Sequence, residues 1–139
     1  MSIRNQNLET VAPILATFKI SQTLNVDDLK DTNIGEPVAV SGNSEVGPLA
    51  SDGQLLGKLI ALTLTDNDDG ERVATVQIGG VCRLAISATY PTIGNRVVGG
   101  GNGTVKQAPT VASDPDGGNV SRGTVLDVNG TTDCIILLN

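Results

Sequence analysis

Short runs of alternating apolar and polar residues, separated by glycine-rich turns, dominate this chain of 139 residues. A period of two places successive side chains on opposite faces of a β-strand. Residues 25–30 suggest one helical turn, which is too short to form a stable helix alone. The remaining runs predict strands at Ile14–Ile20, Pro37–Val40, Leu59–Thr65, Arg72–Ile78, Val97–Val98, Thr104–Ala108, Thr124–Val128 and Thr132–Leu138.

Residues 57–86 are the most informative stretch, because they predict a β-hairpin that turns at Gly79-Gly80. A two-residue loop would mix polar and apolar side chains on both faces of the hairpin. A three-residue loop, Gly79–Val81, separates them, so we expect this loop and a buried Cys82. The buried face would then hold Ala74, Val76, Ile78, Cys82, Leu84 and Ile86.

The strand Leu59–Thr65 also has one uniformly apolar face, which consists of Ile60, Leu62 and Leu64. We expect that face to point into the core. The segment Asp66–Gly70 that follows predicts an exposed acidic turn.

The C-terminal segment predicts a second hairpin, with a two-residue turn at Asn129-Gly130. This turn length avoids placing Asp127 opposite Asp133. The run 134–138 is apolar on both faces, which indicates a central or interface strand rather than an exposed edge.

Composition narrows the fold class. Phe18 and Tyr90 are the only aromatic residues, so Val, Ile, Leu and Ala must build the core. Seventeen glycines and six prolines indicate many turns. We expect a small all-β domain over residues 13–139, an antiparallel β-sandwich, β-tulip or jelly-roll-like domain. The polar residues 1–12 lack periodicity and predict an extended N-terminal arm.

The net charge of −6 argues against direct binding of nucleic acid, which needs clustered Lys and Arg. The N-terminus lacks the apolar core of a signal peptide, and no run approaches the ~20 apolar residues of a membrane span. We therefore expect synthesis in a cytoplasm and no membrane partner.

The sequence predicts no metal site, no cofactor and no enzyme. The chain has no His, and its two cysteines, Cys82 and Cys134, lie far apart, which favours two buried thiols over a metal site. A disulfide between them remains the alternative. Asp66–Gly70 does not match a calcium loop, because Gly70 occupies a ligand position.

The glycine-rich run Gly99–Gly103 lacks the features of a phosphate-binding loop and predicts a turn or a close backbone contact. Nucleophilic catalysis would need a base beside Ser, Thr or Cys, and without His only Lys or a carboxylate could serve.

The strand-turn-strand VATVQIGGVCRLAI, the step IGNRVVGGGNGTV and the closing GTVLDVNGTTDCIILLN together resemble the small phage capsid decoration, or cement, proteins. The resemblance covers about residues 35–139. An aromatic residue often follows Gly-Gly-Val in such proteins, whereas this chain has Cys82.

The resemblance implies a head-stabilising virion protein on the outer capsid surface. It would bind the major capsid protein, bridge neighbouring capsomers and form a homotrimer. The N-terminal arm would contribute capsid contacts, for which we name Ile3, Arg4, Asn5 and Gln6.

Two other classes of function remain open. One is a different virion structural protein, such as a tail-tube or head-completion protein, which ring assembly in isolation would favour. The other is a carbohydrate- or peptide-binding β-module, which a polar cleft around Tyr90 would favour.

Overall fold

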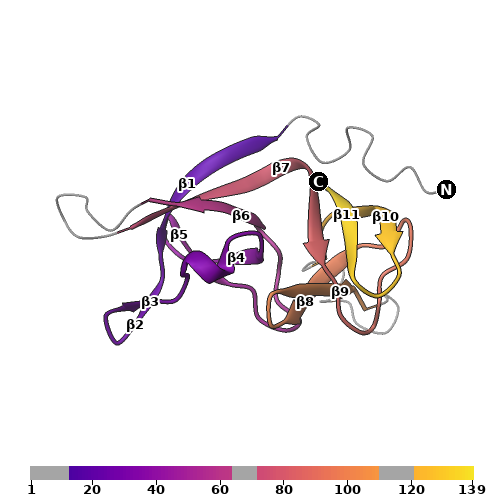
Figure 1. Ribbon diagram of the computed structural model, residues 1–139, viewed down its shortest axis with the longest axis horizontal. Coiled ribbons are helices and arrows are strands. Elements are labelled where there is room, and N and C mark those ends of the chain that lie inside the picture. Colours follow the sequence, from indigo (N-terminus) through magenta and orange to yellow (C-terminus); the bar gives the residue numbers. More distant parts are fainter. Residues whose placement is uncertain (1–12, 64–71, 110–120) are drawn as a thin grey trace.

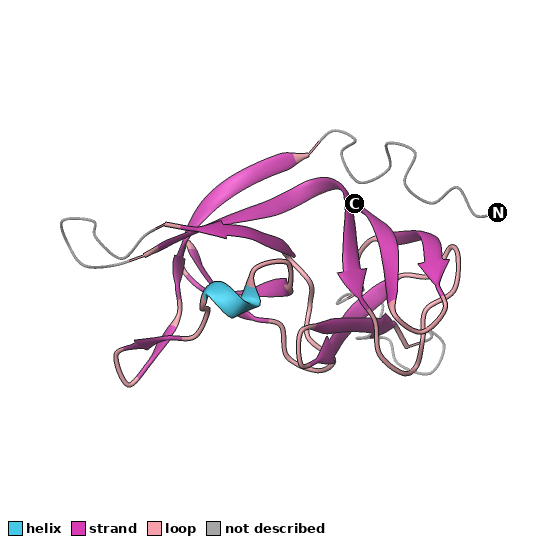
Figure 2. Ribbon diagram, viewed as in Figure 1, coloured by secondary structure: helices cyan, strands magenta, loops and turns pink. Residues whose placement is uncertain are grey.

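The computed structural model describes residues 13–63, 72–109 and 121–139, which form β-strands and one short 3₁₀ turn (Figure 2). The expectation of a small all-β domain is confirmed. The predicted arm 1–12 and the acidic turn Asp66–Gly70 lie outside the described residues. So does most of the segment 112–122, ASDPDGGNVSR, whose sequence predicts a long exposed loop that ends at Arg122. The strands are β1 (Ile14–Ile20), β2 (Gln22–Thr23), β3 (Val26–Asp27), β4 (Pro37–Gly42), β5 (Glu45–Pro48), β6 (Gly57–Leu62), β7 (Val73–Ala85), β8 (Val97–Gly101), β9 (Thr104–Gln107), β10 (Thr124–Asn129) and β11 (Asp133–Leu138), and the 3₁₀ turn is Asp31–Asn33.

The main sheet has seven strands in the order β1-β5-β4-β6-β7-β11-β10 (Figure 1). Strand β1 also pairs with β7, so five of these strands close into a barrel-like ring. Strands β11 and β10 extend the sheet from the second half of β7. Two small hairpins, β2-β3 and β8-β9, complete the described fold. The pairing of β1 with β5 is parallel, and the other pairings between these strands are antiparallel.

Strand β7 is continuous over 13 residues, so the predicted hairpin loop Gly79–Val81 is wrong. Its first half pairs with β1 and β6, and its second half pairs with β11. A three-residue loop and an uninterrupted strand both place residues 74, 76, 82, 84 and 86 on one face. The alternation therefore could not distinguish them.

The Gly-Gly pair marks a bend in β7, which Figure 1 shows running along the top of the closed ring and then turning down beside β11. Gly80 has a φ of 86°, a conformation that side chains disfavour. At Gly79 a Cβ would lie 2.9 Å from Cδ1 of Ile14, so a larger residue there would make the Ile14 side chain of β1 shift.

The side chain of Gln77 satisfies the backbone carbonyls at this bend. Its amide Nε2 donates hydrogen bonds to the carbonyl oxygens of Gly79 and Val81, each at 3.0 Å. Gln77 is only 5% exposed. A buried amide without acceptors would cost about 1–3 kcal/mol, so these bonds are what allows a polar residue there.

The core consists of two aliphatic clusters that share β7 as their common strand. The predicted burial of Cys82 is confirmed. Cys134 is also buried, and the two cysteines are not joined in a disulfide. The cluster inside the closed ring contains Ile20, Leu29, Val38, Val46, Leu59, Ala74 and Val76. The other contains Leu49, Leu55, Cys82, Leu84, Ile86, Val97, Val105, Val125, Cys134, Ile136 and Leu138.

The predicted inward face of the strand beginning at Leu59 is wrong at Ile60, although Leu62 packs against the cluster inside the ring and Leu64 lies outside the described residues. Leu59 is fully buried, whereas Ile60 is 37% exposed. The pairing register with β7 shifts between Leu59 and Ala61, and this bulge turns Ile60 outward. The periodicity of β6 alone could not indicate a bulge.

The predicted helical turn at 25–30 is also wrong. Residues 26–27 form β3, and the 3₁₀ turn lies further on, at Asp31–Asn33. Two residues of positive φ, Leu24 and Asn25, close the β2-β3 hairpin.

The C-terminal hairpin is confirmed, with a different loop. Asn129 pairs with Asp133, so the loop has three residues rather than two, and Asp127 still avoids Asp133 by pairing with Ile135. Strand β11 lies between β7 and β10, as its apolar character predicts. Ile135 and Ile136, whose side chains point to opposite faces, are both fully buried.

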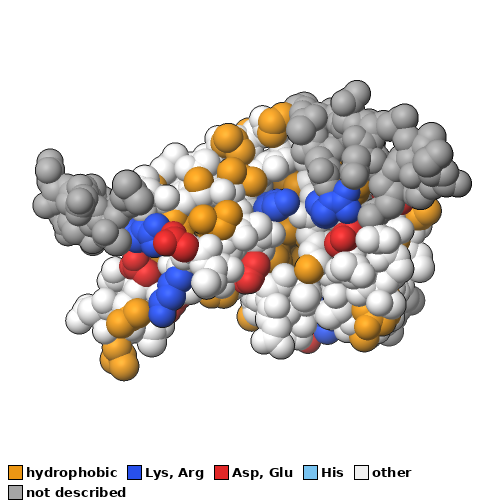
Figure 3. Space-filling model, in the orientation of Figure 1, with side chains coloured by type: hydrophobic (Ala, Val, Ile, Leu, Met, Phe, Trp, Pro, Cys, Tyr) orange, Lys and Arg blue, Asp and Glu red, His pale blue; other side chains and the backbone are white. Residues whose placement is uncertain are grey.

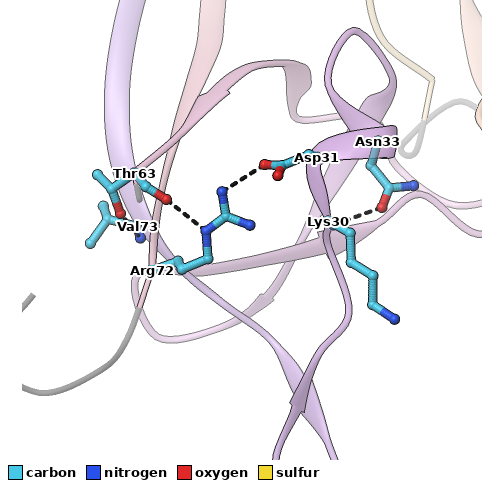
Figure 4. A network of polar contacts seen from close by, with 6 residues as sticks. All are labelled: Lys30, Asp31, Asn33, Thr63, Arg72 and Val73. Carbon is cyan, nitrogen blue, oxygen red and sulfur yellow. Dashed lines mark hydrogen bonds and ion pairs between the residues drawn. The ribbon is translucent and has the colours of Figure 1, made fainter. Parts of the chain in front are cut away.

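A polar network fastens the 3₁₀ turn to the edge of the closed ring (Figure 4). Arg72 donates from Nη2 to Oδ1 of Asp31 and from Nε to the carbonyl oxygen of Thr63, both at 2.6 Å. The Asn33 side chain accepts from the Lys30 backbone N–H at 2.8 Å. Asp31 is exposed, so its ion pair positions the turn and contributes at most about 1 kcal/mol.

The burial of Cys82 predicts a loss of stability at high pH. Burial raises the pKa of this thiol to about 11, although the nearby cations Lys58 and Arg122 favour the thiolate. Above about pH 9 the unfolded chain releases the proton while the folded protein keeps it. Between pH 9 and 11, Cys82 should therefore remove up to roughly 2–3 kcal/mol from the free energy of unfolding.

Urea unfolding of the wild type and of Cys82→Ala between pH 7 and 10.5 measures this effect. The stability difference between the two proteins should be constant below pH 8.5 and should then change in favour of the variant. A difference that stays constant up to pH 10.5 would show that Cys82 ionises freely in the folded state.

Candidate binding pocket

A pocket of about 630 Å³ opens between β4, β5, the loop that follows β5, and the bend of β7. Among the residues that line this pocket, Arg122 is the one with a charged side chain, and we therefore call the pocket the Arg122 pocket. Val40 is 63% exposed, so the lining includes an apolar residue open to solvent. The apolar side chains that line it include Ala39, Val40, Pro48, Leu55, Leu56 and Ile78.

The loop at one side of the pocket lies directly on β8. The N–H of Asp52 donates to the carbonyl oxygen of Gly99 at 2.8 Å, and the N–H of Gly99 donates to that of Gly53 at 2.9 Å. A Cβ at Gly99 would lie 1.9 Å from the carbonyl oxygen of Ala50. This close backbone contact is one of the two roles that the sequence predicts for the run Gly99–Gly103.

The same run also forms a turn. Asn102 and Gly103 both have positive φ and close the β8-β9 hairpin. The run Gly99–Gly103 thus has a structural role, because it holds the pocket loop through backbone hydrogen bonds. Strand β9 follows it, as the sequence predicts.

Arg122 joins the parts of the chain that meet at the pocket. Its backbone pairs with Val97 through two hydrogen bonds of 3.0 Å. Its guanidinium donates to the carbonyl oxygen of Leu56 and, at 2.5 Å, to that of Ile78. The side chain therefore ties the pocket loop to β7 just before the bend.

The guanidinium of Arg122 is a partly buried cation, and burial lowers its pKa. In the part of the chain that the structure describes, no carboxylate forms an ion pair with it. A guanidinium has five N–H donors, so further donors remain after the two carbonyls are bound. The pocket combines apolar walls with a cation that can attract an acidic partner.

This arrangement suits binding of an apolar group, and the lining offers no nucleophile or metal ligand. Over residues 13–63, 72–109 and 121–139, no group of three or more His, Cys, Asp and Glu side chains could hold a metal ion. In the same residues no helix has the length and apolar character needed to span a membrane.

Of two smaller hollows, the first is polar and the second has both polar and apolar walls. One, of about 220 Å³, is lined by charged side chains that include Lys19, Asp27, Glu45 and Arg72. The other, of about 320 Å³, is lined by Asp52, Thr89, Lys106, Gln107, Ala108 and Pro109. Tyr90, around which a polar cleft would favour a carbohydrate-binding module, lines neither of them.

The sequence did not identify the Arg122 pocket. Its walls come from segments that are up to 83 positions apart, Ala39 to Arg122, and no local pattern shows that they meet. Arg122 stood at the end of a predicted exposed loop. The residues that the sequence did propose, Ile3, Arg4, Asn5 and Gln6, lie outside the described residues.

Comparisons with protein-family models, with curated proteins and with solved structures found no match for this chain.

Replacing Arg122 tests its role as a tie. Arg122→Met leaves two carbonyl oxygens, those of Leu56 and Ile78, without their charged donor, so we expect a loss of about 2–4 kcal/mol in the free energy of unfolding. Arg122→Lys keeps a cation that can reach one of the two carbonyl oxygens, so its free energy of unfolding should fall by about half as much as that of Arg122→Met. Urea unfolding measures both, and equal stability of Arg122→Met and wild type would contradict the role.

Proposed function

We propose that this protein is a capsid decoration protein, which binds the outer surface of an assembled phage head and stabilises the contacts between capsomers. The proposal rests on the resemblance of residues 35–139 to that family and on an all-β fold that offers apolar contact surface. The partner would be the major capsid protein, and the site of action would be the virion.

The observation that carries this proposal is the exposure of large aliphatic side chains on an acidic protein. Leu24 is 92% exposed, Ile93 is 73% exposed and Val40 is 63% exposed. A partner that covers such side chains stabilises the complex by about 25 cal/mol per Å² of apolar surface removed from water. These residues lie in separate segments, a hairpin tip, a loop and a strand, so different ones can contact the capsid and neighbouring copies of the chain.

Binding to a capsid does not require that any one of these exposed side chains makes a strong contact. A symmetric shell presents the same site many times, and linked copies gain avidity without a single strong contact. A homotrimer would bring three such surfaces to neighbouring capsomers. The net charge of −6 keeps the unbound protein soluble and self-repelling.

Mixing the purified protein with undecorated phage heads tests the proposal. We expect saturable binding at micromolar protein and added density at symmetric positions in electron cryomicroscopy. Decorated heads should also resist heat or chelator better than bare heads. Protein that stays in the supernatant at micromolar concentration would contradict the proposal.

The proposed arm contacts have their own test. Deleting residues 1–12 should weaken binding to heads at least tenfold, because Ile3, Arg4, Asn5 and Gln6 are lost together. The unfolding midpoint of the truncated protein in urea serves as the folding control. Undiminished binding by a folded truncation would remove the arm from the interface.

A further inference from the structure

The β2-β3 hairpin has an unusual residue at its turn. Leu24 and Asn25 form a two-residue loop with φ values of 52° and 63°. Positive φ at both central positions is the type I′ pattern, in which Asn and Gly are strongly preferred. A leucine in this conformation costs about 1–2 kcal/mol, so folding stability alone does not favour Leu24.

The same residue is also the most exposed large apolar side chain among the described residues. Leu24 is 92% exposed, and Val26 beside it is 53% exposed. Figure 1 shows the hairpin projecting from the body of the molecule at the lower left, and Figure 3 shows apolar side chains at its tip. Both the backbone conformation and the exposure of Leu24 are unfavourable in an isolated monomer.

Hydrogen bonds at its base hold the hairpin in place. Asp28 accepts from the Ser21 hydroxyl at 2.7 Å and from the Thr23 hydroxyl at 2.8 Å. The Asp27 carboxylate accepts from Gln22 Nε2 at 2.9 Å. The tip is therefore presented in a fixed shape, which reduces the entropy cost of binding.

The Arg122 pocket provides a complementary surface on the same chain. Its walls are aliphatic, and its volume of about 630 Å³ falls within the range typical of ligand pockets, ~300–1,000 Å³. Residues 21–28 of the hairpin carry two carboxylates, Asp27 and Asp28, and no basic side chain. The pocket carries the cation of Arg122 without a carboxylate partner among the described residues. Apolar character and charge therefore match between tip and pocket.

We propose that the β2-β3 tip of one copy inserts into the Arg122 pocket of the next copy. Leu24 and Val26 would pack against the aliphatic walls, with the acidic base of the hairpin facing Arg122. Tip and pocket are different surfaces, so the contact is head-to-tail, and it closes into a ring when the rotation between copies allows. The inference rests on the homotrimer of the proposed function, for which it supplies the contact.

Two single substitutions separate the tip from the pocket. Leu24→Asn removes the apolar tip and places at the turn a residue that accepts positive φ, so the variant should be at least as stable as wild type. Val40→Glu places a like charge at the exposed wall of the pocket, where it should repel the acidic hairpin. Each variant should lower the association constant at least tenfold in sedimentation equilibrium, while wild type forms a trimer at about 0.1 mM.

A mixture of the two variants gives the sharpest result. The Val40→Glu protein retains an intact tip and the Leu24→Asn protein retains an intact pocket, so a 1:1 mixture restores one contact. We expect a heterodimer that does not grow further. Ile93→Asn, which changes an exposed apolar side chain outside both surfaces, is the matched control and should associate like wild type.

The proposal is overturned if wild type is monomeric at 0.1 mM, if either variant assembles like wild type, or if the mixture stays monomeric. No capsid enters this experiment, so its outcome is separate from that of the head-binding test. A trimer that ignores heads would contradict the decoration role alone, and head binding by a monomer would contradict the tip-and-pocket contact alone.

Discussion

The described structure depends on the continuity of β7 through its bend. One half of this strand closes the barrel-like ring with β1 and β6, and the other half supports β11 and the second cluster. Gly79 and Gly80 permit the bend. The side-chain amide of Gln77 donates hydrogen bonds to the carbonyl oxygens of Gly79 and Val81 at the bend. If β7 ended at the glycines, the two aliphatic clusters would have no common strand.

The two surfaces that we propose for binding lie on different parts of this arrangement. The Arg122 pocket lies beside the bend, and its guanidinium binds the carbonyl oxygen of Ile78, the residue directly before Gly79. The hairpin tip projects from the ring on the chain between β1 and β4. The tip and the pocket are thus two partly aliphatic surfaces of opposite local charge on the same chain.

The sequence predicted the elements whose signals are local. Alternation located β1, the start of β4, β9 and β11, and apolar residues on both faces of β11 correctly indicated a central strand. The burial of Cys82 followed from the same alternation. Aliphatic composition correctly favoured an all-β domain with a core almost free of aromatic side chains.

The remaining features depend on contacts between distant residues, which local patterns do not encode. The Gly-Gly pair looks like a hairpin turn because a bend and a three-residue loop preserve the same alternation. Whether the strand continues depends on whether β1 and β11 are present to pair with it. The bulge at Ile60 and the position of Arg122 over the Leu56 carbonyl likewise arise from packing.

Native-state hydrogen exchange of the β7 amides tests the central claim most directly. If β7 is one strand shared by both clusters, the protected amides before and after Gly79-Gly80 should exchange with the same free energy, equal to that of global unfolding. Their free energies should also fall together as urea is added. Exchange of one half at a free energy several kcal/mol below the other would contradict the account, because the two halves would then unfold independently.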